Sequence, residues 1–358
     1  MITVVIMCQQ GIPFDLSPAR TQIIDELSVR GTRVIVFFPG IVNEKKIRTK
    51  ASSIINTKRM DNLSIRRKIK SIDPDVVICT TIEDVKSCFL LPYIMKNTDF
   101  YYYNLEIYVR SRRWKADNLV WKYVNKIDYI ENKIKEILYV KGCKAMVIQD
   151  KLRKRISSKY WIAHPKTWLI PNSYSSGCSN HNVQHKNGVI YSGLMSNDVL
   201  KSFIEQVQYI DGFQITMSGW DCTEIRRLKA NPNIKVIQQK LSEDDYTKFI
   251  SAYDIALMWY ESDQDENIYN IGLSSGKFFK HLSLRQPVIV NNAPGLADEI
   301  KKYGLGVVIN DLSELSSAVK TIYTDYDIYV ENIDRIYKKK YDFKKVSKSF
   351  FDSIVDGQ

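Results

Sequence analysis

The stretch that most constrains the fold is residues 271–309, in which two helices alternate with two strands. It reads IGLSSGKFFKHLSLRQPVIVNNAPGLADEIKKYGLGVVI. Ser274 and Ser275 are good helix N-caps, and the residues up to Leu282 have helical apolar spacing. VIV and VVI are continuous apolar runs of the kind that parallel sheets bury on both faces. The segment therefore predicts a parallel α/β sheet with a ligand-facing loop at each helix start.

The two helix starts in this segment are candidates for anion binding. A helix N-terminus exposes unpaired N–H groups and the positive end of the dipole. Gly276 permits close approach and Lys277 adds an ammonium, while the second helix begins near Pro294 and Gly295. We expect a diphosphate here. A P-loop is excluded, because Walker A needs four residues between its glycines and a Ser or Thr after the lysine.

Length and composition limit the classes of protein to which this chain can belong. A chain of 358 residues suggests two domains, and MITVVIM begins as a buried strand without a basic leader. No apolar run reaches the roughly 20 residues that a membrane span needs. The six cysteines contain no C-x-x-C pair, so we expect reduced thiols without zinc or disulfides. These features predict a cytoplasmic protein.

The charge is concentrated in the first half, where residues 1–170 carry a net charge of +15 and residues 171–358 carry −3. Basic and aromatic residues interleave at 64–70 and 108–123. The second segment contains Arg110, Arg112, Arg113, Trp114 and Lys115. Such a patch suits the interface of an anionic membrane. Nucleic acid could use the same cations, but no recognition motif supports it, and a solvated basic surface is the remaining alternative.

Strands and helices alternate along both halves of the chain. Residues 171–187 are polar and rich in turn residues, as linkers are. The pattern predicts two doubly wound Rossmann-like domains that face a cleft, at 1–170 and 188–327. A last helix at 328–358 is expected to cross back to the first domain. The strands are expected in ITVVIM, VIVFF, DVVICT, FYYYNLEIY, AMVIQ, GVIYSG, FQITMSG, IKVIQ and DIALMW.

The second half resembles the donor domain of a GT-B glycosyltransferase, in the broad group that includes the family 4 enzymes. The matching motifs are P-N at 171–172, Y-S-G at 191–193, M-S-G at 217–219, A-Y-D-I-A-L at 252–257, S-S-G-K at 274–277, P-V-I at 287–289 and G-x-x-x-E-I-x-x-x-G-x-G at 295–306. A narrower similarity, to bacterial galactofuranosyltransferase-like enzymes, rests on Met258-Trp259, S-S-G-K and HLSLRQPVI. The first half matches only through the Gly11 loop and SPARTQIIDEL.

The resemblance implies which residues bind a nucleotide-sugar donor. They are Gly193, Gly219, Lys240, Ser274, Ser275, Gly276, Lys277, Phe278, Pro294 and Gly295. The chain also departs from the family pattern. The paired glutamates of E-x7-E would fall at Gly272 and Lys280, and Arg285 stands where glycine is usual.

The expected chemistry stabilises a departing diphosphate with helix dipoles and Lys277 rather than with a metal or another cofactor. Asp263-Gln264-Asp265 is formally a D-x-D metal motif, yet it lies in an acidic segment that we expect to be a solvated loop. On the acceptor side, Glu106 is the candidate base, with Asp15 as a second candidate beside Gly11. An ion pair of Glu106 with a nearby arginine is equally compatible, and His281 is expected to be structural.

The resemblance implies a metal-independent hexosyltransferase-like enzyme with a UDP-linked sugar as the expected donor. Its saccharide acceptor would belong to a bacterial surface polysaccharide or a lipid-linked oligosaccharide at the inner membrane face. A nucleotide-sugar 2-epimerase shares the fold and remains an alternative. A catalytically silent glycan- or nucleotide-binding protein is a third possibility, because the E-x7-E pair is missing.

Overall fold

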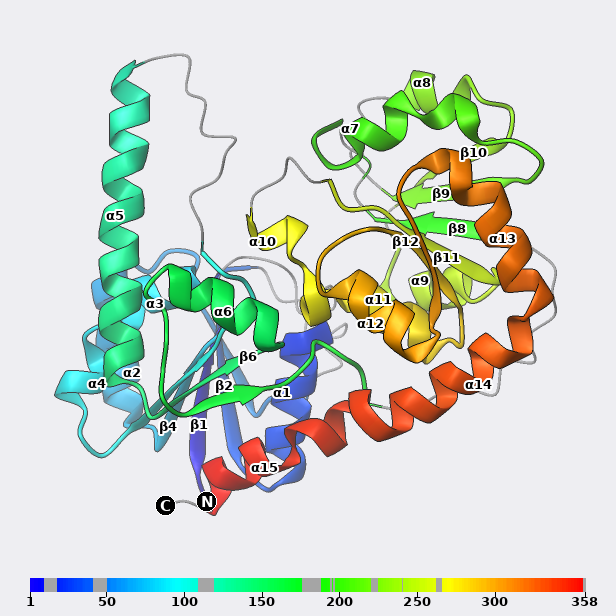
Figure 1. Cartoon of the computed structure of the whole chain (residues 1–358). Coiled ribbons are helices and arrows are strands. Elements are labelled where there is room, and N and C mark those ends of the chain that lie inside the picture. The colour runs from blue at the N-terminus through cyan, green and yellow to red at the C-terminus, as the bar shows by residue number, and fades with distance from the viewer. Residues whose placement is uncertain are drawn as a thin grey trace. The chain divides into compact units, whose positions relative to one another are not determined.

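The computed structural model describes residues 1–9, 18–40, 50–108, 119–175, 188–193, 195, 197–219, 225–239, 241–261 and 266–356. The chain divides into two compact units, one made of Met1–Asn172 and Phe343–Gln358 and the other of Ser173–Asp342. Each unit is a parallel sheet covered by helices on both faces (Figure 1). The predicted pair of doubly wound α/β domains is confirmed.

The first unit contains a seven-stranded sheet in the order β3-β2-β1-β4-β5-β6-β7. Its strands are β1 (Thr3–Met7), β2 (Arg33–Phe38), β3 (Ser53–Asn56), β4 (Val76–Cys79), β5 (Asp99–Tyr103), β6 (Ala145–Ile148) and β7 (Thr167–Leu169). Val4, Val5 and Ile6 of β1 are fully buried. Such continuous apolar burial is what a central parallel strand requires.

Helices cover the two faces of this sheet with separate cores. They are α1 (Pro18–Val29), α2 (Asn62–Ile72), α3 (Ile82–Cys88), α4 (Leu91–Ile94), α5 (Leu119–Gly142), α6 (Lys151–Lys159) and α15 (Phe343–Val355). One core contains residues of α2, α3, α5 and α6, and the other contains residues of α1 and α15. Ile23, Ile24 and Leu27 point into the second core, as their spacing predicts.

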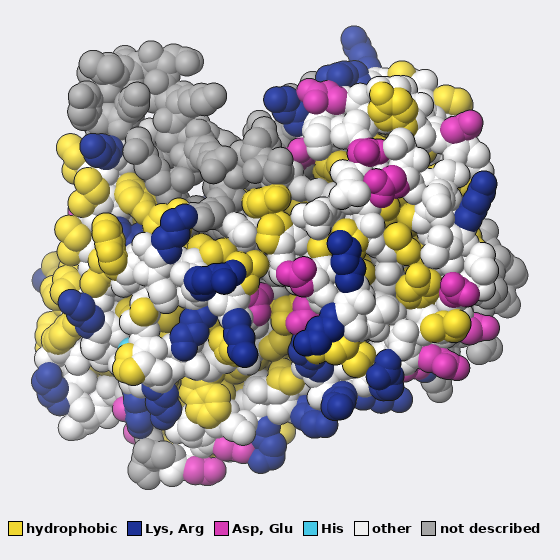
Figure 2. Space-filling view, viewed as in Figure 1, with side chains coloured by type: hydrophobic (Ala, Val, Ile, Leu, Met, Phe, Trp, Pro, Cys, Tyr) yellow, Lys and Arg dark blue, Asp and Glu magenta, His cyan; other side chains and the backbone are white. Residues whose placement is uncertain are grey.

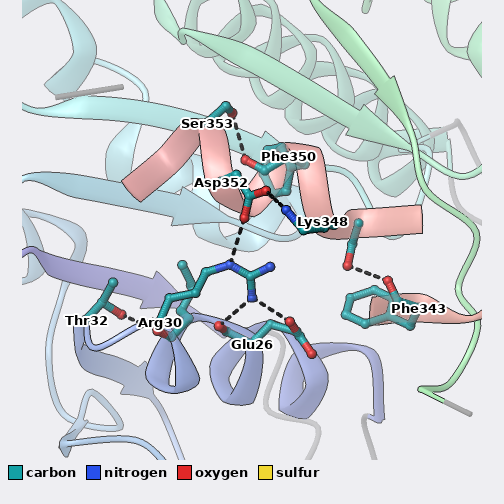
Figure 3. Close-up of polar contacts among 10 residues, drawn as sticks. Glu26, Arg30, Thr32, Phe343, Lys348, Phe350, Asp352 and Ser353 are labelled. Atoms are coloured by element: carbon teal, nitrogen blue, oxygen red, sulfur yellow. Dashed lines mark hydrogen bonds and ion pairs between the residues drawn. The ribbon is translucent and has the colours of Figure 1, made fainter. Parts of the chain in front are cut away.

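Charged side chains join α15 to α1 (Figure 3), and an aromatic contact joins α15 to β5. The Arg30 guanidinium donates to Glu26 Oε2 at 2.5 Å and to Asp352 Oδ1 at 3.4 Å. The Phe350 ring meets the Tyr101 ring edge-on at 5.7 Å. Phe343–Gln358 therefore completes the first unit although it follows the whole second unit in sequence.

The second unit contains a six-stranded sheet in the order β10-β9-β8-β11-β12-β13. Its strands are β8 (Val189–Ser192), β9 (Ile215–Gly219), β10 (Ile234–Gln238), β11 (Ile255–Met258), β12 (Val288–Asn291) and β13 (Gly306–Ile309). Its helices are α7 (Asn197–Glu205), α8 (Ile225–Lys229), α9 (Glu243–Ile250), α10 (Glu266–Tyr269), α11 (Gly276–Ser283), α12 (Leu296–Tyr303), α13 (Leu315–Thr324) and α14 (Tyr326–Ile336). The strand order reverses at β8, so β8 and β11 flank the topological switch point.

The predicted single helix at 328–358 is interrupted. The helix α14 ends at Ile336, a π-helical turn follows over Tyr337–Tyr341, and Asp342 is extended with φ −58° and ψ 111° before α15 begins. Tyr337 and Tyr341 are both buried in the second unit's core. Anchoring two aromatic rings so close together explains why the basic run between them does not continue as a regular helix.

The cysteines are consistent with a reduced protein. Among the residues that the structure describes, Cys8, Cys79, Cys88 and Cys143 are buried free thiols. Burial raises the pKa of Cys143 to about 12, so this thiol stays protonated and unreactive. Cys178 and Cys222 lie outside the described residues.

Candidate functional site

Two glycines shape the carboxyl edge of the second sheet. Gly193 directly follows β8 with φ +141°, and its N–H donates to Ser218 O at 2.9 Å. A Cβ on Gly219, the last residue of β9, would lie 1.7 Å from the Gly193 carbonyl oxygen. Only glycine therefore allows the two strand ends to approach this closely. Gly193 and Gly219 therefore present backbone without side chains beside the switch point.

The helix α11 begins at this edge with a well-formed N-cap. Ser275 Oγ accepts from the Phe278 N–H at 3.3 Å and is bonded to Tyr260 Oη at 2.6 Å. The predicted cap at Ser275 is confirmed, whereas Ser274 lies in the preceding turn and donates its hydroxyl to Ile271 O. The N–H groups of Gly276 and Lys277 have no acceptor within the helix by its geometry, so they are available to an anion.

Phe278 supports the site from the core. Its side chain is fully buried, against Phe279 and Tyr341. The sequence interpretation had grouped Phe278 with donor-binding residues, but its ring lies in the core and its N–H donates to the Ser275 cap. Its ring anchors α11 to the sheet.

Lys277 supplies a positive charge to this site. The side chain is half-buried, and its Nζ lies 5.3 Å from the centre of the Tyr191 ring and 5.7 Å from that of Tyr260. Among the described residues no carboxylate pairs with it. Burial lowers its pKa from 10.5 to about 8. Within the described part of the chain, the ammonium is therefore a partly desolvated cation with no carboxylate partner.

The two tyrosines place this cation at the topological switch point. Tyr191 belongs to β8 and Tyr260 follows β11, the two strands that flank the reversal in strand order. Burial raises the pKa of Tyr260 to about 12, and it raises the pKa of Tyr191 well above its usual range. Both rings are thus neutral and offer only their π-faces to the ammonium. In open α/β sheets, ligands bind at this point of the carboxyl edge.

A chain of hydrogen bonds holds β8 against α11. Tyr246 Oη donates to Ser192 Oγ at 2.8 Å, and Ser192 Oγ lies 3.1 Å from His281 Nε2. His281 Nδ1 lies 2.6 Å from Gln286 Oε1. Burial is the main cause that lowers the His281 pKa to about 4, helped by the charge of Lys277. The imidazole is neutral and fixes Gly193 next to Lys277.

The start of α12 is the second helix N-terminus at this edge. Gly295 is its N-cap with φ +75°, which glycine adopts without strain, and Pro294 precedes it. The Asn291 side chain joins the ends of β11 and β12, because it accepts from Tyr260 N at 2.9 Å and donates to Tyr260 O at 2.6 Å. The two helix starts and Lys277 thus come from neighbouring strand ends.

Arg285 occupies a position where the backbone favours glycine. Its φ is +61°, directly after α11. The guanidinium compensates by binding both carboxylate oxygens of Asp334, at 2.9 and 2.7 Å. This departure from the family pattern is therefore a local structural solution.

Several candidates cannot be related to this geometry. Glu106 is described, and it is exposed just after β5 of the first unit. The remaining candidates lie outside the described residues, and they are Gly11, Asp15, Arg110, Arg112, Arg113, Trp114, Lys115, Lys240, Asp263 and Asp265. The predicted membrane patch and the D-x-D segment therefore have no structural description.

Sequence reasoning missed the tyrosines around Lys277. Tyr191 had been noted only as part of a Y-S-G turn, and Tyr260 follows a strand that was read as buried core. Their common signal is an aromatic residue at the carboxyl end of each strand that flanks the switch point. Predicting the strand order first would have identified both.

The described residues contain neither a cluster of potential metal ligands nor a membrane-spanning helix. No group of three or more His, Cys, Asp or Glu side chains in that part of the chain is placed to hold a metal ion. None of the described helices is both long and apolar enough to span a bilayer.

Comparison with known proteins agrees with this geometry. Residues 189–342 match the family model described as the glucosyltransferase 3-like C-terminal domain. Similar solved structures include a glycosyltransferase from Rickettsia africae, with TM-score 0.69, 13% identity, and coverage of 100% of this chain and 99% of that one. WaaG, a glycosyltransferase involved in lipopolysaccharide biosynthesis, gives TM-score 0.67 at 12% identity over 98% and 99% of the two chains. The pneumococcal O-GlcNAc transferase GtfA, in complex with UDP and GlcNAc, gives 0.66 at 8% identity over 99% of each. No curated protein matches the sequence.

Proposed function

Because residues 189–342 match the family model of the glucosyltransferase 3-like C-terminal domain and the whole chain has the GT-B glycosyltransferase fold, we propose that this protein transfers a sugar from a UDP-linked donor to a saccharide acceptor. The acceptor belongs to a bacterial surface polysaccharide or a lipid-linked oligosaccharide. The enzyme works at the cytoplasmic face of the cell membrane. Support for UDP comes from the pneumococcal relative, whose structure contains UDP and GlcNAc.

One observation carries the proposal: a half-buried lysine ammonium at the switch point of the second sheet, for which the described residues provide no carboxylate partner. Lys277 Nζ lies between the rings of Tyr191 and Tyr260, beside the backbone of Gly193. A cation next to glycine backbone and a helix start suits the charge of a diphosphate.

In the proposed reaction, negative charge develops on the departing UDP. The bond from the anomeric carbon to the β-phosphate oxygen breaks and leaves its electron pair on UDP, while a bond forms to the acceptor oxygen. The Lys277 ammonium and the α11 N–H groups stabilise the growing negative charge, which removes the need for a metal or another cofactor. Glu106 accepts the proton of the acceptor hydroxyl. The ring of Phe278 keeps α11 in place during this step.

The donor and acceptor are assigned to different units. Gly193, Gly219 and the segment from Ser274 to Lys277 bind the donor diphosphate, and the resemblance adds Lys240 to this set. Pro294 and Gly295 face the sugar. In the first unit, Gly11, Asp15 and Glu106 serve the acceptor. Arg110, Arg112, Arg113, Trp114 and Lys115 contact the membrane.

A turnover assay tests the proposal. The protein is incubated with UDP-sugars, with and without oligosaccharide acceptors, and released UDP and free sugar are both quantified. UDP release that depends on the acceptor supports transfer. Conversion of the donor to a free sugar without any acceptor would indicate a 2-epimerase, and a donor that binds but stays unchanged would indicate a silent binding protein.

A further inference from the structure

The outward face of α5 presents a stripe of isoleucines to solvent. Ile127, Ile130 and Ile134 are 65%, 47% and 53% exposed. Their spacing of three and four residues places them in one row along the helix. The opposite side of α5 is already buried, with Tyr139 and Val140 in the core and Glu136 fully covered. The stripe is therefore additional to the face that folds the unit.

One flank of the outward-facing isoleucine stripe leads to the side of α5 that faces α6. Lys133, next to Ile134 and one turn after Ile130, has its Nζ 5.6 Å from the centre of the Tyr160 ring, directly after α6. Lys135 on the other side approaches Phe89 at 5.8 Å, next to α3. The exposed acids of α5 are on that α3 side. Glu131 pairs there with Lys135, and Asp128 accepts from Asn132.

The neighbouring helix α6 adds positive charge to the same face of the unit. Its buried residues Arg153, Ile156 and Ser157 point toward the sheet. Its outward side chains form a set of exposed cations, Lys151, Lys154, Arg155 and Lys159. No acidic residue occurs anywhere in residues 151–197. Figure 2 shows apolar side chains along α5 and dark-blue cations over α6.

The requirements of folding do not explain why position 161 is a tryptophan. The Trp161 and Ile162 N–H groups donate to Ser158 O and Ser157 O, which closes α6 with a Schellman motif. Trp161 occupies the left-handed position of that motif with φ +61°, where glycine is favoured. Its side chain is 76% exposed and so gains little packing. Both backbone and burial disfavour a tryptophan here.

We propose that the isoleucine stripe, the α6 cations and Trp161 together dock the first unit on an anionic lipid bilayer. This inference rests on the proposed function and deepens it by adding to its membrane contact a surface made of described residues, and vesicle binding can be measured without turnover. Isoleucines insert among acyl chains, tryptophan prefers the interface, and each lysine or arginine near an anionic leaflet strengthens binding about fivefold.

A protein partner or RNA would fit this docking surface less well than a bilayer. A stable protein interface buries about 1,200–2,000 Å² in total, more than one row of three isoleucines supplies. Two copies of a unit whose residues 1–170 carry a net charge of +15 also repel each other. RNA would use the cations but would leave the isoleucine stripe unexplained, since RNA binds through phosphate contacts and base stacking. An anionic bilayer accounts for all three features.

Co-sedimentation with vesicles tests the proposal on the full chain. Wild type is expected to bind vesicles that mix phosphatidylglycerol with phosphatidylcholine and to bind poorly to phosphatidylcholine alone. Replacing the three isoleucines with serine should weaken binding about tenfold or more. Replacing the four α6 cations with glutamine should do the same at low salt, with a smaller effect at high salt. Trp161→Gly should weaken binding while raising the melting temperature, because glycine relieves the left-handed strain.

Matched variants give the controls. Ile328→Ser removes an equally exposed isoleucine from the second unit. Glutamine at Lys229, Lys235, Lys338 and Lys339 removes four exposed cations there. Both should bind vesicles like wild type, and UDP should stabilise every variant equally if the donor site is as proposed. Vesicle binding that is unchanged in the stripe and α6 variants would overturn the proposal. So would loss of self-association or RNA binding in those variants while vesicle binding persists.

Discussion

Lys277→Met should stabilise the fold and abolish donor binding. Methionine keeps the unbranched stem between the rings of Tyr191 and Tyr260 but carries no charge. Burial lowers the pKa of Lys277 from 10.5 to about 8, and a pKa unit corresponds to about 1.4 kcal/mol. Because the side chain is half-buried, solvent screening reduces the effect, and we expect a gain of about 1–2 kcal/mol at pH 7. Lost cation–π contacts offset about 0.5–1 kcal/mol of it.

The lowered pKa of Lys277 also predicts how the free energy of unfolding and the affinity for UDP change with pH. Between pH 8 and pH 10.5 the unfolded chain binds a proton on Lys277 that the folded chain has lost. The free energy of unfolding therefore rises with pH across this window. That rise should be absent in Lys277→Met. In the wild type, affinity for UDP should fall as the pH passes 8, since the ammonium is then neutralised.

The assay is thermal unfolding with and without UDP. At about 100 times its dissociation constant, UDP should stabilise the wild type by about 2.7 kcal/mol. The variant should show no shift at the same concentration, and its turnover should fall about 10²–10³-fold. Lys320→Met, at an exposed lysine of α13, is the control and should match wild type. A variant that binds UDP as tightly as wild type would refute the assignment of the diphosphate site.

Three further sets of substitutions test the role of Glu106 as base, the packing of Gly219 and the D-x-D segment. Glu106→Gln should lower turnover about 10²–10³-fold without changing UDP affinity, and an equal loss of UDP affinity would contradict a role as base. Gly219→Ala should destabilise the fold by about 3 kcal/mol, because its Cβ would meet the Gly193 carbonyl oxygen at 1.7 Å, and a melting temperature like wild type would be inconsistent with that packing. Asparagine at both Asp263 and Asp265 should leave UDP binding unchanged in the presence of a chelator, whereas a metal-dependent loss would restore the D-x-D interpretation.

Local signals in the sequence predicted much of the fold. The predicted N-cap Ser275 does begin α11, where its hydroxyl accepts from the Phe278 N–H. The apolar runs identified the central strands because those strands are buried on both faces. Such features depend on residues close together in sequence, and a single chain displays them directly.

What the sequence did not predict depends on contacts between distant residues. The electrostatics of Lys277 come from Tyr191 and Tyr260, which reach it only once the sheet order is known. The role of His281 likewise depends on its hydrogen bond with Ser192 of β8, which is far away in sequence. A residue type on its own cannot show such contacts.

The most direct test of the central claim is calorimetric titration of the wild type with UDP near pH 8, in a chelator and in buffers of different ionisation enthalpy. A diphosphate beside Lys277 raises the pKa of the ammonium, so binding should take up about half a proton per UDP. Lys277→Met should take up none. Tight binding without proton uptake, or binding that requires a divalent metal, would contradict a donor site built on this lysine.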